Sequence, residues 1–168
     1  MSTQQAVYDT VAAFLTANQI DWEPGARDFE LVANLPGERK LKTGCSLLVG
    51  ETDLTTTAFV IRNADENHVG FYRFLLRKNL KLPGLAYGID GDGDVYVTSR
   101  VPIGGVDDVY LDRLLGAVLA AADEVFNELL VLGFFSSMKK EWDWRISRGE
   151  STRNLEAFRH LLAPETGP

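Results

Sequence analysis

The chain has 168 residues, of which 45% are hydrophobic and 24% are charged, and its formal net charge is −7. This composition is typical of one soluble globular domain, and the acidic balance argues against nucleic acid as the main partner. No apolar run approaches the ~20 residues that cross a bilayer, the first residues lack a secretory signal pattern, and Cys45 is the only cysteine. These features predict a cytoplasmic protein without membrane insertion and without internal disulfides.

The N-terminal half of the sequence predicts one helix followed by three strands. Apolar residues recur at helical spacing within residues 4–18, and the Pro-Gly pair within residues 21–25 is predicted to turn the chain. Three segments of alternating apolar and β-branched residues follow, at 28–35, 41–49 and 54–62. The turns between them are too short for parallel crossovers, so antiparallel pairing is predicted.

The second half of the sequence predicts a helix over about 67–79, then strands at 85–90 and 94–103. A long helix is predicted from Asp107 or Asp108 to Gly133, because its apolar residues form one broad stripe. The element order α-β-β-β-α-β-β-α, with a C-terminal helix added, indicates an α+β fold. We expect an antiparallel five-stranded sheet with the helices on one face.

The C-terminal part carries two tryptophans in the stretch KEWDWR. Residues 134–151 are predicted to form a strand or an irregular segment, in which Trp142 and Trp144 would share one face. Trp and Arg are enriched in binding hot spots, which makes Trp142, Trp144 and Arg145 candidates for partner contacts. The competing interpretation, favoured for at least one tryptophan, is that it covers the edge of the core.

Beyond that stretch, Ser151 is predicted to cap a last helix that contains Leu155, Phe158 and Leu161. Residues 164–168 are expected to fray.

Three aspartates alternate with glycines in the stretch YGIDGDGDVYV, at Asp90, Asp92 and Asp94. A calcium-binding EF-hand loop starting at the first aspartate would need glycine at its sixth position and glutamate at its twelfth, and both positions are valine here. Gly91 and Gly93 can supply positive φ angles, as hairpin turns require. The stretch therefore predicts a β-hairpin rather than a metal site.

No catalytic set is recognisable in the sequence. Two histidines and one cysteine do not make a zinc site, and there is no P-loop, nucleophile elbow or dinucleotide fingerprint. Cys45 lies on the apolar side of a predicted strand and is expected to be a buried hydrophobic residue. We expect no enzymatic activity and no cofactor. The alternatives are a small-ligand protein or enzyme with a dispersed site near Asp90, Asp92 and His68, or a calcium-responsive regulator.

Three consecutive segments resemble the YbjN-domain family, and most of all its actinobacterial branch. They are the helix FYRFLLRKN, the hairpin region LPGLAYGIDGDGDVYVTSRVPI and the helix LDRLLGAVLAAADEVFNELLVLGF. The matching positions include Asn79, Asp90, Gly93, Asp94 and Pro102. The resemblance covers most of residues 4–135, and the tail resembles an extension of that branch. We therefore expect residues 1–168 to form a single YbjN-like domain, with a core at 4–135 and a C-terminal extension at 136–163.

The resemblance implies a fold like that of type III secretion chaperones, which commonly dimerise and bind extended segments of a partner polypeptide. It brings no catalytic residues with it. We expect a non-enzymatic protein-binding or peptide-binding protein, chaperone-like or a regulatory adaptor, acting as a homodimer. The candidate contact residues are Tyr87, Tyr96, Trp142, Trp144 and Arg145.

Overall fold

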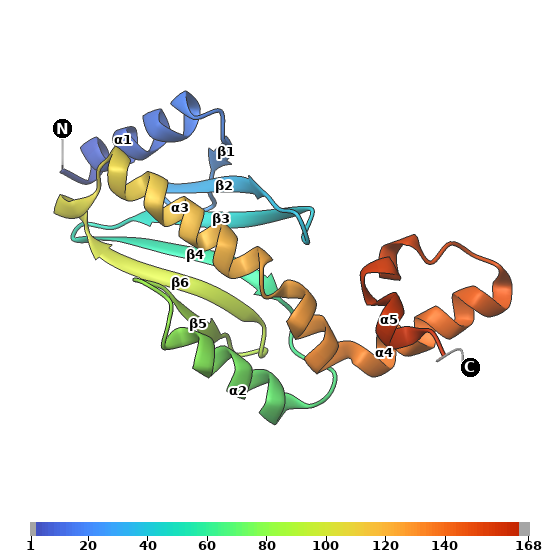
Figure 1. The fold of residues 1–168 in the computed structure, drawn as a ribbon. Coiled ribbons are helices and arrows are strands. Elements are labelled where there is room, and N and C mark those ends of the chain that lie inside the picture. The colour runs from blue at the N-terminus through green and yellow to red at the C-terminus, as the bar shows by residue number, and fades with distance from the viewer. Residues whose placement is uncertain (1–2, 165–168) are drawn as a thin grey trace.

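The computed structural model describes residues 3–164, so most of the segment expected to fray lies outside the described residues. It contains one antiparallel sheet in the order β1-β2-β3-β4-β6-β5. Helices α1 (Thr3–Ala17) and α3 (Asp108–Asp123) cover one face of this sheet, and α2 (His68–Asn79) lies beside β5 (Figure 1). The strands are β1 (Asp21–Pro24), β2 (Glu30–Pro36), β3 (Lys42–Val49), β4 (Asp53–Ile61), β5 (Ala86–Ile89) and β6 (Val95–Pro102).

The predicted α+β class is confirmed, but the sheet has six strands and not five. The additional strand is β1, in the segment that the sequence predicts to be a turn. Gln19 adopts a φ of 57° and completes the chain reversal earlier than expected. The residues that follow are therefore free to pair with β2, where Asp21 lies opposite Asn34 and Pro24 opposite Leu31.

The strand predicted at 28–35 begins two residues later than expected. Phe29 has a φ of 60°, in the left-handed region, which extended strand backbone does not use. Strand β2 therefore starts at Glu30, and its partly buried neighbour Phe29 packs edge-on against Tyr8 of α1, with 6.0 Å between ring centroids.

The prediction of a single helix that ends at Gly133 is wrong. Two helices occupy this region, and the second extends beyond Gly133. Helix α3 ends at Asp123, and α4 (Phe126–Arg148) continues past Gly133. At the break, the Arg39 guanidinium donates a hydrogen bond to the backbone carbonyl of Glu124. At its start, α3 is capped as expected, since Asp107 accepts a hydrogen bond from the Tyr110 N–H at 2.8 Å.

The prediction of a strand or an irregular segment at 134–151 is also wrong, since residues up to Arg148 belong to α4. Ion pairs four residues apart, which suit a helix, join Lys139 to Asp143 and Glu141 to Arg145, each at 2.8 Å. The helix ends where Gly149 adopts a φ of 66°.

The last helix differs from its prediction. Ser151 Oγ accepts a hydrogen bond from the Arg153 N–H at 3.3 Å, but the segment that follows is a 3-10 helix, η2 (Arg153–Phe158), and then a short α5 (Arg159–Leu162). Leu161 lies in α5, within the predicted helix, and is exposed, whereas the neighbouring Leu162 is buried. A second hydrophobic cluster, separate from the main core, joins this segment to α4 and contains Met138, Trp142, Leu155, Phe158 and Leu162.

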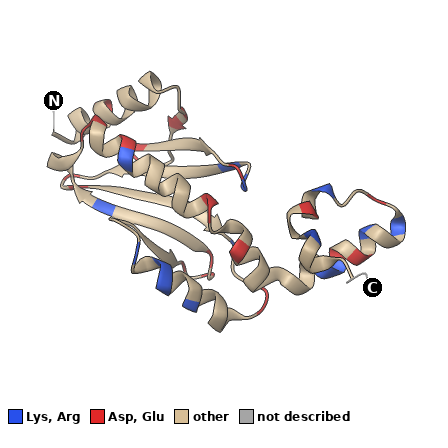
Figure 2. Ribbon diagram, viewed as in Figure 1, with Lys and Arg blue, Asp and Glu red and all other residues tan. Residues whose placement is uncertain are grey.

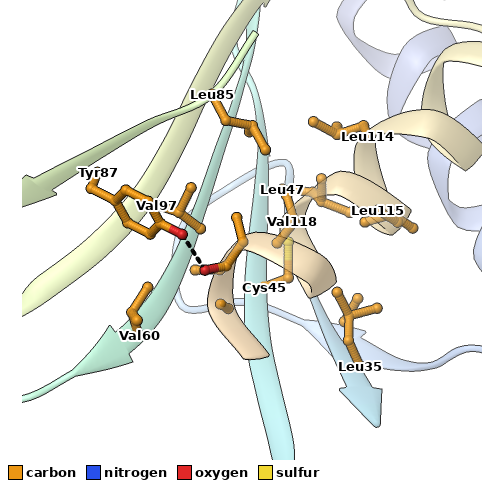
Figure 3. Packing of buried hydrophobic residues seen from close by; sticks show 14 of the residues in the cluster. Leu35, Cys45, Leu47, Val60, Leu85, Tyr87, Val97, Leu114, Leu115 and Val118 are labelled. Atoms are coloured by element: carbon orange, nitrogen blue, oxygen red, sulfur yellow. Dashed lines mark hydrogen bonds between the residues drawn. The ribbon is translucent and has the colours of Figure 1, made fainter. Parts of the chain in front are cut away.

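The main core lies between the sheet and the helices α1 and α3, and Figure 3 shows part of it. Cys45 is fully buried there, as predicted, and burial raises the pKa of its thiol to about 12. The thiol is therefore protonated and inert at neutral pH. Where α4 crosses α2, Gly133 is required, because a Cβ atom at this position would lie 2.7 Å from the Ala64 Cβ and 2.9 Å from Phe71 Cδ2.

Glu30 supplies a pH-dependent contribution to stability. The hydrogen bonds from the Arg27 side chain and from Ser46 Oγ, the latter 2.6 Å long, lower the pKa of this buried carboxyl from 4.5 to about 2. A carboxyl with a lowered pKa stabilises the fold above its unfolded pKa, and this contribution is lost as the pH falls from about 4.5 to about 2. We expect Glu30→Gln to be about 2 kcal/mol less stable at pH 7, and urea titrations should show the difference from wild type vanishing towards pH 2.

Candidate protein interaction surface

An exposed apolar surface lies on α2 and β5, and we call it the α2–β5 face. Helix α2 buries Phe71 and Leu75 against the core, whereas Leu76 is 67% exposed and Leu80 just beyond the helix is 88% exposed. Val69 and Ile89 are also exposed, at 69% and 51%. Isolated exposed apolar residues need no explanation, whereas contiguous exposed apolar groups are typical of interaction sites.

Two shallow grooves contribute to the α2–β5 face. One of about 250 Å³ lies between α2 and β5, where Tyr72 and Leu76 face Gly88 and Ile89. The other, of about 570 Å³, follows the outer side of α2 from Val69 to Leu80. Both grooves are lined mainly by carbon atoms, which suits the apolar side chains of a protein partner.

Strand β5 is an edge strand of the sheet, and a side chain blocks its outer side at Tyr87. The Asn79 amide accepts a hydrogen bond from the Tyr87 N–H at 2.7 Å and donates one to the Tyr87 carbonyl at 3.1 Å. A side chain that bonds both the backbone N–H and the backbone carbonyl of an edge residue leaves neither group free to pair with another strand. Strand addition at Tyr87 is therefore blocked, and the exposed side chains are what this part of the face offers to another chain.

Charge is unevenly distributed along α2 and the loop before it. The helix carries three basic residues and no acidic one, although the chain as a whole is acidic. Figure 2 shows these basic residues along α2 and acidic residues in the preceding loop. The acidic residues are Asp65 and Glu66, and the basic residues are Arg73, Arg77 and Lys78.

The aspartate stretch forms the turn of the β5–β6 hairpin. Asp90 Oδ1 accepts hydrogen bonds from the Asp92 and Asp94 N–H groups, both at 3.0 Å, and Asp94 Oδ1 accepts one from the Asn63 N–H at 2.8 Å. Gly93 has the predicted positive φ, 84°, but Gly91 does not. Among residues 3–164, no group of three or more ligating side chains is arranged to hold a metal ion.

The alternative small-molecule site near Asp90, Asp92 and His68 gains no geometric support. The Asp90 carboxyl is engaged in its own turn. His68 is the first residue of α2, and its ring lies 6.1 Å from the Tyr72 ring centroid in a tilted arrangement. The grooves described on this surface are lined by other side chains.

Of the candidate contact residues on the hairpin, only Tyr96 is accessible. Tyr87 is buried, and its hydroxyl donates a hydrogen bond to the Ala121 carbonyl of α3, which is drawn as a dashed line in Figure 3. Burial raises the pKa of the Tyr87 hydroxyl. Tyr87 is therefore a core residue and not a surface contact. Tyr96 is partly buried on the opposite face of the sheet and packs edge-on against Phe59 at 5.6 Å.

The two tryptophans do not share a face, because they lie in a helix and not in a strand. Residues two apart in a helix point about 200° apart. Trp142 is 4% exposed and belongs to the second hydrophobic cluster, whereas Trp144 is 48% exposed with the Arg148 guanidinium 5.2 Å from its ring. Arg145 is bound to Glu141 and to the Ser151 carbonyl, so it holds the tail segment to α4.

The family model whose description is "Putative bacterial sensory transduction regulator", YbjN, matches residues 8–131. A protein of Mycobacterium leprae is 49% identical over 154 residues, which are 92% of this chain and 83% of that protein. A protein of Mycobacterium tuberculosis is 51% identical over 138 residues, covering 82% of this chain and 75% of the relative. Both relatives are described as uncharacterized.

Solved structures share the fold at low sequence identity. The crystal structure of the ExsC–ExsE complex contains a chain with a TM-score of 0.58 and 21% identity, matched over 77% of this chain and 97% of that one. YbjN from E. coli has a TM-score of 0.53 and 11% identity, over 72% and 92%. The HopA1–SchA chaperone–effector complex contains a chain with a TM-score of 0.53 and 12% identity, over 73% and 94%.

Within the described part of the chain, no helix has the length and apolarity needed to cross a membrane.

The family match extends over well more than half of the sequence and includes the sheet, α2 and α3. The fold is that of type III secretion chaperones, as the resemblance implied. On the strength of this match and of the close relatives, the chain belongs to the YbjN family.

Proposed function

We propose that this protein is a non-enzymatic chaperone-like or adaptor protein that binds another polypeptide. The observation that carries this proposal is the α2–β5 face, an exposed apolar surface whose shallow grooves are lined mainly by carbon atoms. Enzyme sites are concave and combine an apolar pocket with a few precisely placed polar groups. Two solved structures with this fold are protein–protein complexes, the ExsC–ExsE complex and the HopA1–SchA chaperone–effector complex, which is consistent with the proposal.

We further propose that the α2–β5 face joins two copies of the chain in a homodimer in the cytoplasm. In a two-fold symmetric dimer the same patch lies on both subunits, so it must complement itself. Packing two α2 helices antiparallel would place Arg77 and Lys78 of one copy near Asp65 and Glu66 of the other. The apolar residues Leu76 and Leu80 would then be covered between them.

Replacing Leu76 with aspartate tests the dimer. We expect wild type to sediment as a dimer at micromolar concentration and Leu76→Asp to weaken dimerisation at least 100-fold, since a buried unpaired charge costs several kcal/mol. Val109→Asp is the matched control, because Val109 is similarly exposed but lies at the start of α3. A wild-type monomer at 100 µM, or equal effects of both variants, would refute the proposed interface.

Binding of a partner is tested by affinity capture from native cytosol with quantitative mass spectrometry. We expect one protein to be recovered in stoichiometric amount with wild type and with Val109→Asp. Partner contacts are proposed for Tyr96, Trp144 and Arg145, so Trp144→Ala should reduce recovery while leaving the melting temperature unchanged, because its side chain is half exposed. If recovery with wild type does not exceed that with a tag alone, the adaptor proposal is rejected.

A further inference from the structure

A second cleft, distinct from the α2–β5 face, lies where α4 passes the end of β4, and it has a volume of about 470 Å³. Figure 1 shows α4 leaving the body of the protein at this point. Its apolar walls include Phe59, Ile61, Phe126, Leu130, Phe134 and Met138. Met138 and Glu141 lie beyond the residues that the family model matches, so the C-terminal extension completes this cleft.

A β-bulge forms the floor of the cleft and places one cation in it. The β4–β6 register shifts between Phe59 and Ile61, and the Lys40 ammonium donates hydrogen bonds to the Phe59 carbonyl at 2.8 Å and the Val60 carbonyl at 2.9 Å. A bulge of this kind leaves backbone groups unpaired, and Lys40 satisfies two of them. Two of the three ammonium N–H donors are thereby used, and one is left for a ligand.

Lys40 carries a charge that no carboxylate neutralises directly. It lies 5.4 Å from the Phe59 ring centroid and 5.7 Å from that of Phe126, and within residues 3–164 it forms no ion pair. Partial burial lowers its pKa, and the more distant Asp123 only partly offsets this effect. An ammonium in an aromatic, partly dehydrated site attracts an incoming carboxylate more strongly than one in water.

The other charged groups of the cleft are already paired and fix its shape. The Arg62 guanidinium lies 4.3 Å from the Phe134 ring centroid and makes a two-point ion pair with Asp65, with N···O distances of 2.7 and 3.1 Å. Glu141 is bound by Arg145 at 2.8 Å. The cleft therefore has one uncompensated positive charge, in a chain whose net charge is −7.

We propose that this cleft binds a segment of the partner polypeptide in which an acidic residue is adjacent to a large apolar one. The carboxylate would meet the free donor of Lys40, and the apolar side chain would enter between β4 and α4. This inference rests on the proposed protein-binding function and adds the chemistry of the bound segment. It assigns to the C-terminal extension the role of one wall of the site.

The experiment is a titration of the full chain with two fluorescein-labelled peptides, monitored by anisotropy and by amide chemical shifts. In the acidic peptide two glutamates alternate with phenylalanine and leucine, and in the neutral peptide both glutamates are replaced by glutamine. We expect the acidic peptide to bind about tenfold more tightly, since one charge-assisted hydrogen bond contributes about 1.4 kcal/mol. The shifts should concentrate on Phe59–Arg62 and on α4.

Variants of Lys40 decide whether the preference comes from this cleft. Lys40→Met keeps the apolar stem and should bind the two peptides equally, whereas Lys40→Arg keeps the charge and should retain the preference. Lys42→Met is the control, because Lys42 is an exposed lysine at the start of the neighbouring strand. Equal affinity for both peptides in wild type, or an undiminished preference in a folded Lys40→Met variant, overturns the inference.

The outcomes separate this inference from the proposed function. If both peptides bind equally and shift residues outside the cleft, the protein binds polypeptides, but the cleft does not select acidic ones. If neither peptide binds and no partner is captured from cytosol, both proposals fail. Binding of free phenylacetate to the cleft with the same Lys40 dependence, but no binding of the acidic peptide, would make it a small-molecule site and also reject the inference.

Discussion

Asp123→Ala is expected to lower the free energy of unfolding by roughly 2–4 kcal/mol, because it removes three charge-assisted hydrogen bonds. The Asp123 carboxylate is buried and accepts hydrogen bonds from the backbone N–H groups of Glu38, Arg39 and Lys40, at distances of 2.9–3.2 Å. Burial opposes its ionisation and is the largest single influence, but the three donors outweigh it and lower its pKa. The side chain thus anchors the β2–β3 hairpin to the end of α3.

Chemical denaturation of Asp123→Ala and of the control Asp112→Ala measures this contribution. Asp112 is exposed on the same helix, and its replacement is expected to change stability by less than about 0.5 kcal/mol. Because a lowered pKa stabilises the fold only while the carboxyl is ionised, the difference between wild type and Asp123→Ala should shrink as the pH falls below the carboxyl's unfolded pKa. Equal stability of the two variants at pH 7 would show that the anchor contributes nothing.

The anchor also positions the cleft, since Lys40 is one of its three donors. If the hairpin loosens in Asp123→Ala, the Lys40 ammonium loses its fixed place beside the β4 bulge. The variant should then lose the preference for the acidic peptide even under conditions where it is fully folded. Retained preference would mean that the bulge alone holds the lysine in position.

Trp142→Ala is expected to detach the segment 149–163 from α4 while leaving the sheet intact. Trp142 is the largest member of the second hydrophobic cluster, and truncating a buried tryptophan costs about 3–5 kcal/mol. That cluster contains few other side chains to compensate for the loss, and it is separate from the main core. Hydrogen exchange should therefore show loss of protection in η2, α5 and the end of α4 only.

The neighbouring Trp144→Ala variant provides the control for this prediction. Trp144 is 48% exposed and is not part of the second hydrophobic cluster, so its replacement should leave hydrogen exchange almost unchanged. If Trp142→Ala instead lowers protection across β3, β4 and α3, the C-terminal extension and the core unfold as one unit. Equal exchange in both variants would contradict the assignment of Trp142 to a buried cluster.

The sequence predicted most accurately those features whose cause is local. The alternation around Cys45 defines a buried strand, because side chains of a strand point to opposite faces. In the aspartate stretch, Val95 and Val101 exclude a calcium loop, and the glycines favour a hairpin. The resemblance to the YbjN family gave the fold, although β1 and the length of α4 were missed.

The candidate site was predicted less well, for two physical reasons. Alternating tryptophans in KEWDWR fit a strand, but the ion pairs Lys139–Asp143 and Glu141–Arg145 fit a helix, and the helix prevails. Apolar residues in α2 cover more than one side, and only packing shows that Phe71 faces the core while Leu76 faces solvent. A helix whose apolar residues extend beyond one stripe is the signal that could have indicated an exposed interaction surface.

Composition and local pattern thus determined the class of the fold, the burial of Cys45 and the hairpin at Asp90. Tertiary structure alone decided that Asp123 meets the backbone of residues 38–40, that Asn79 closes the edge of β5, and that Lys40 lies in the cleft beneath α4. Each of these contacts joins groups distant in sequence or on different elements, through a single side chain. Periodicity records which face of an element is apolar, but it carries no information on which distant polar group that element meets.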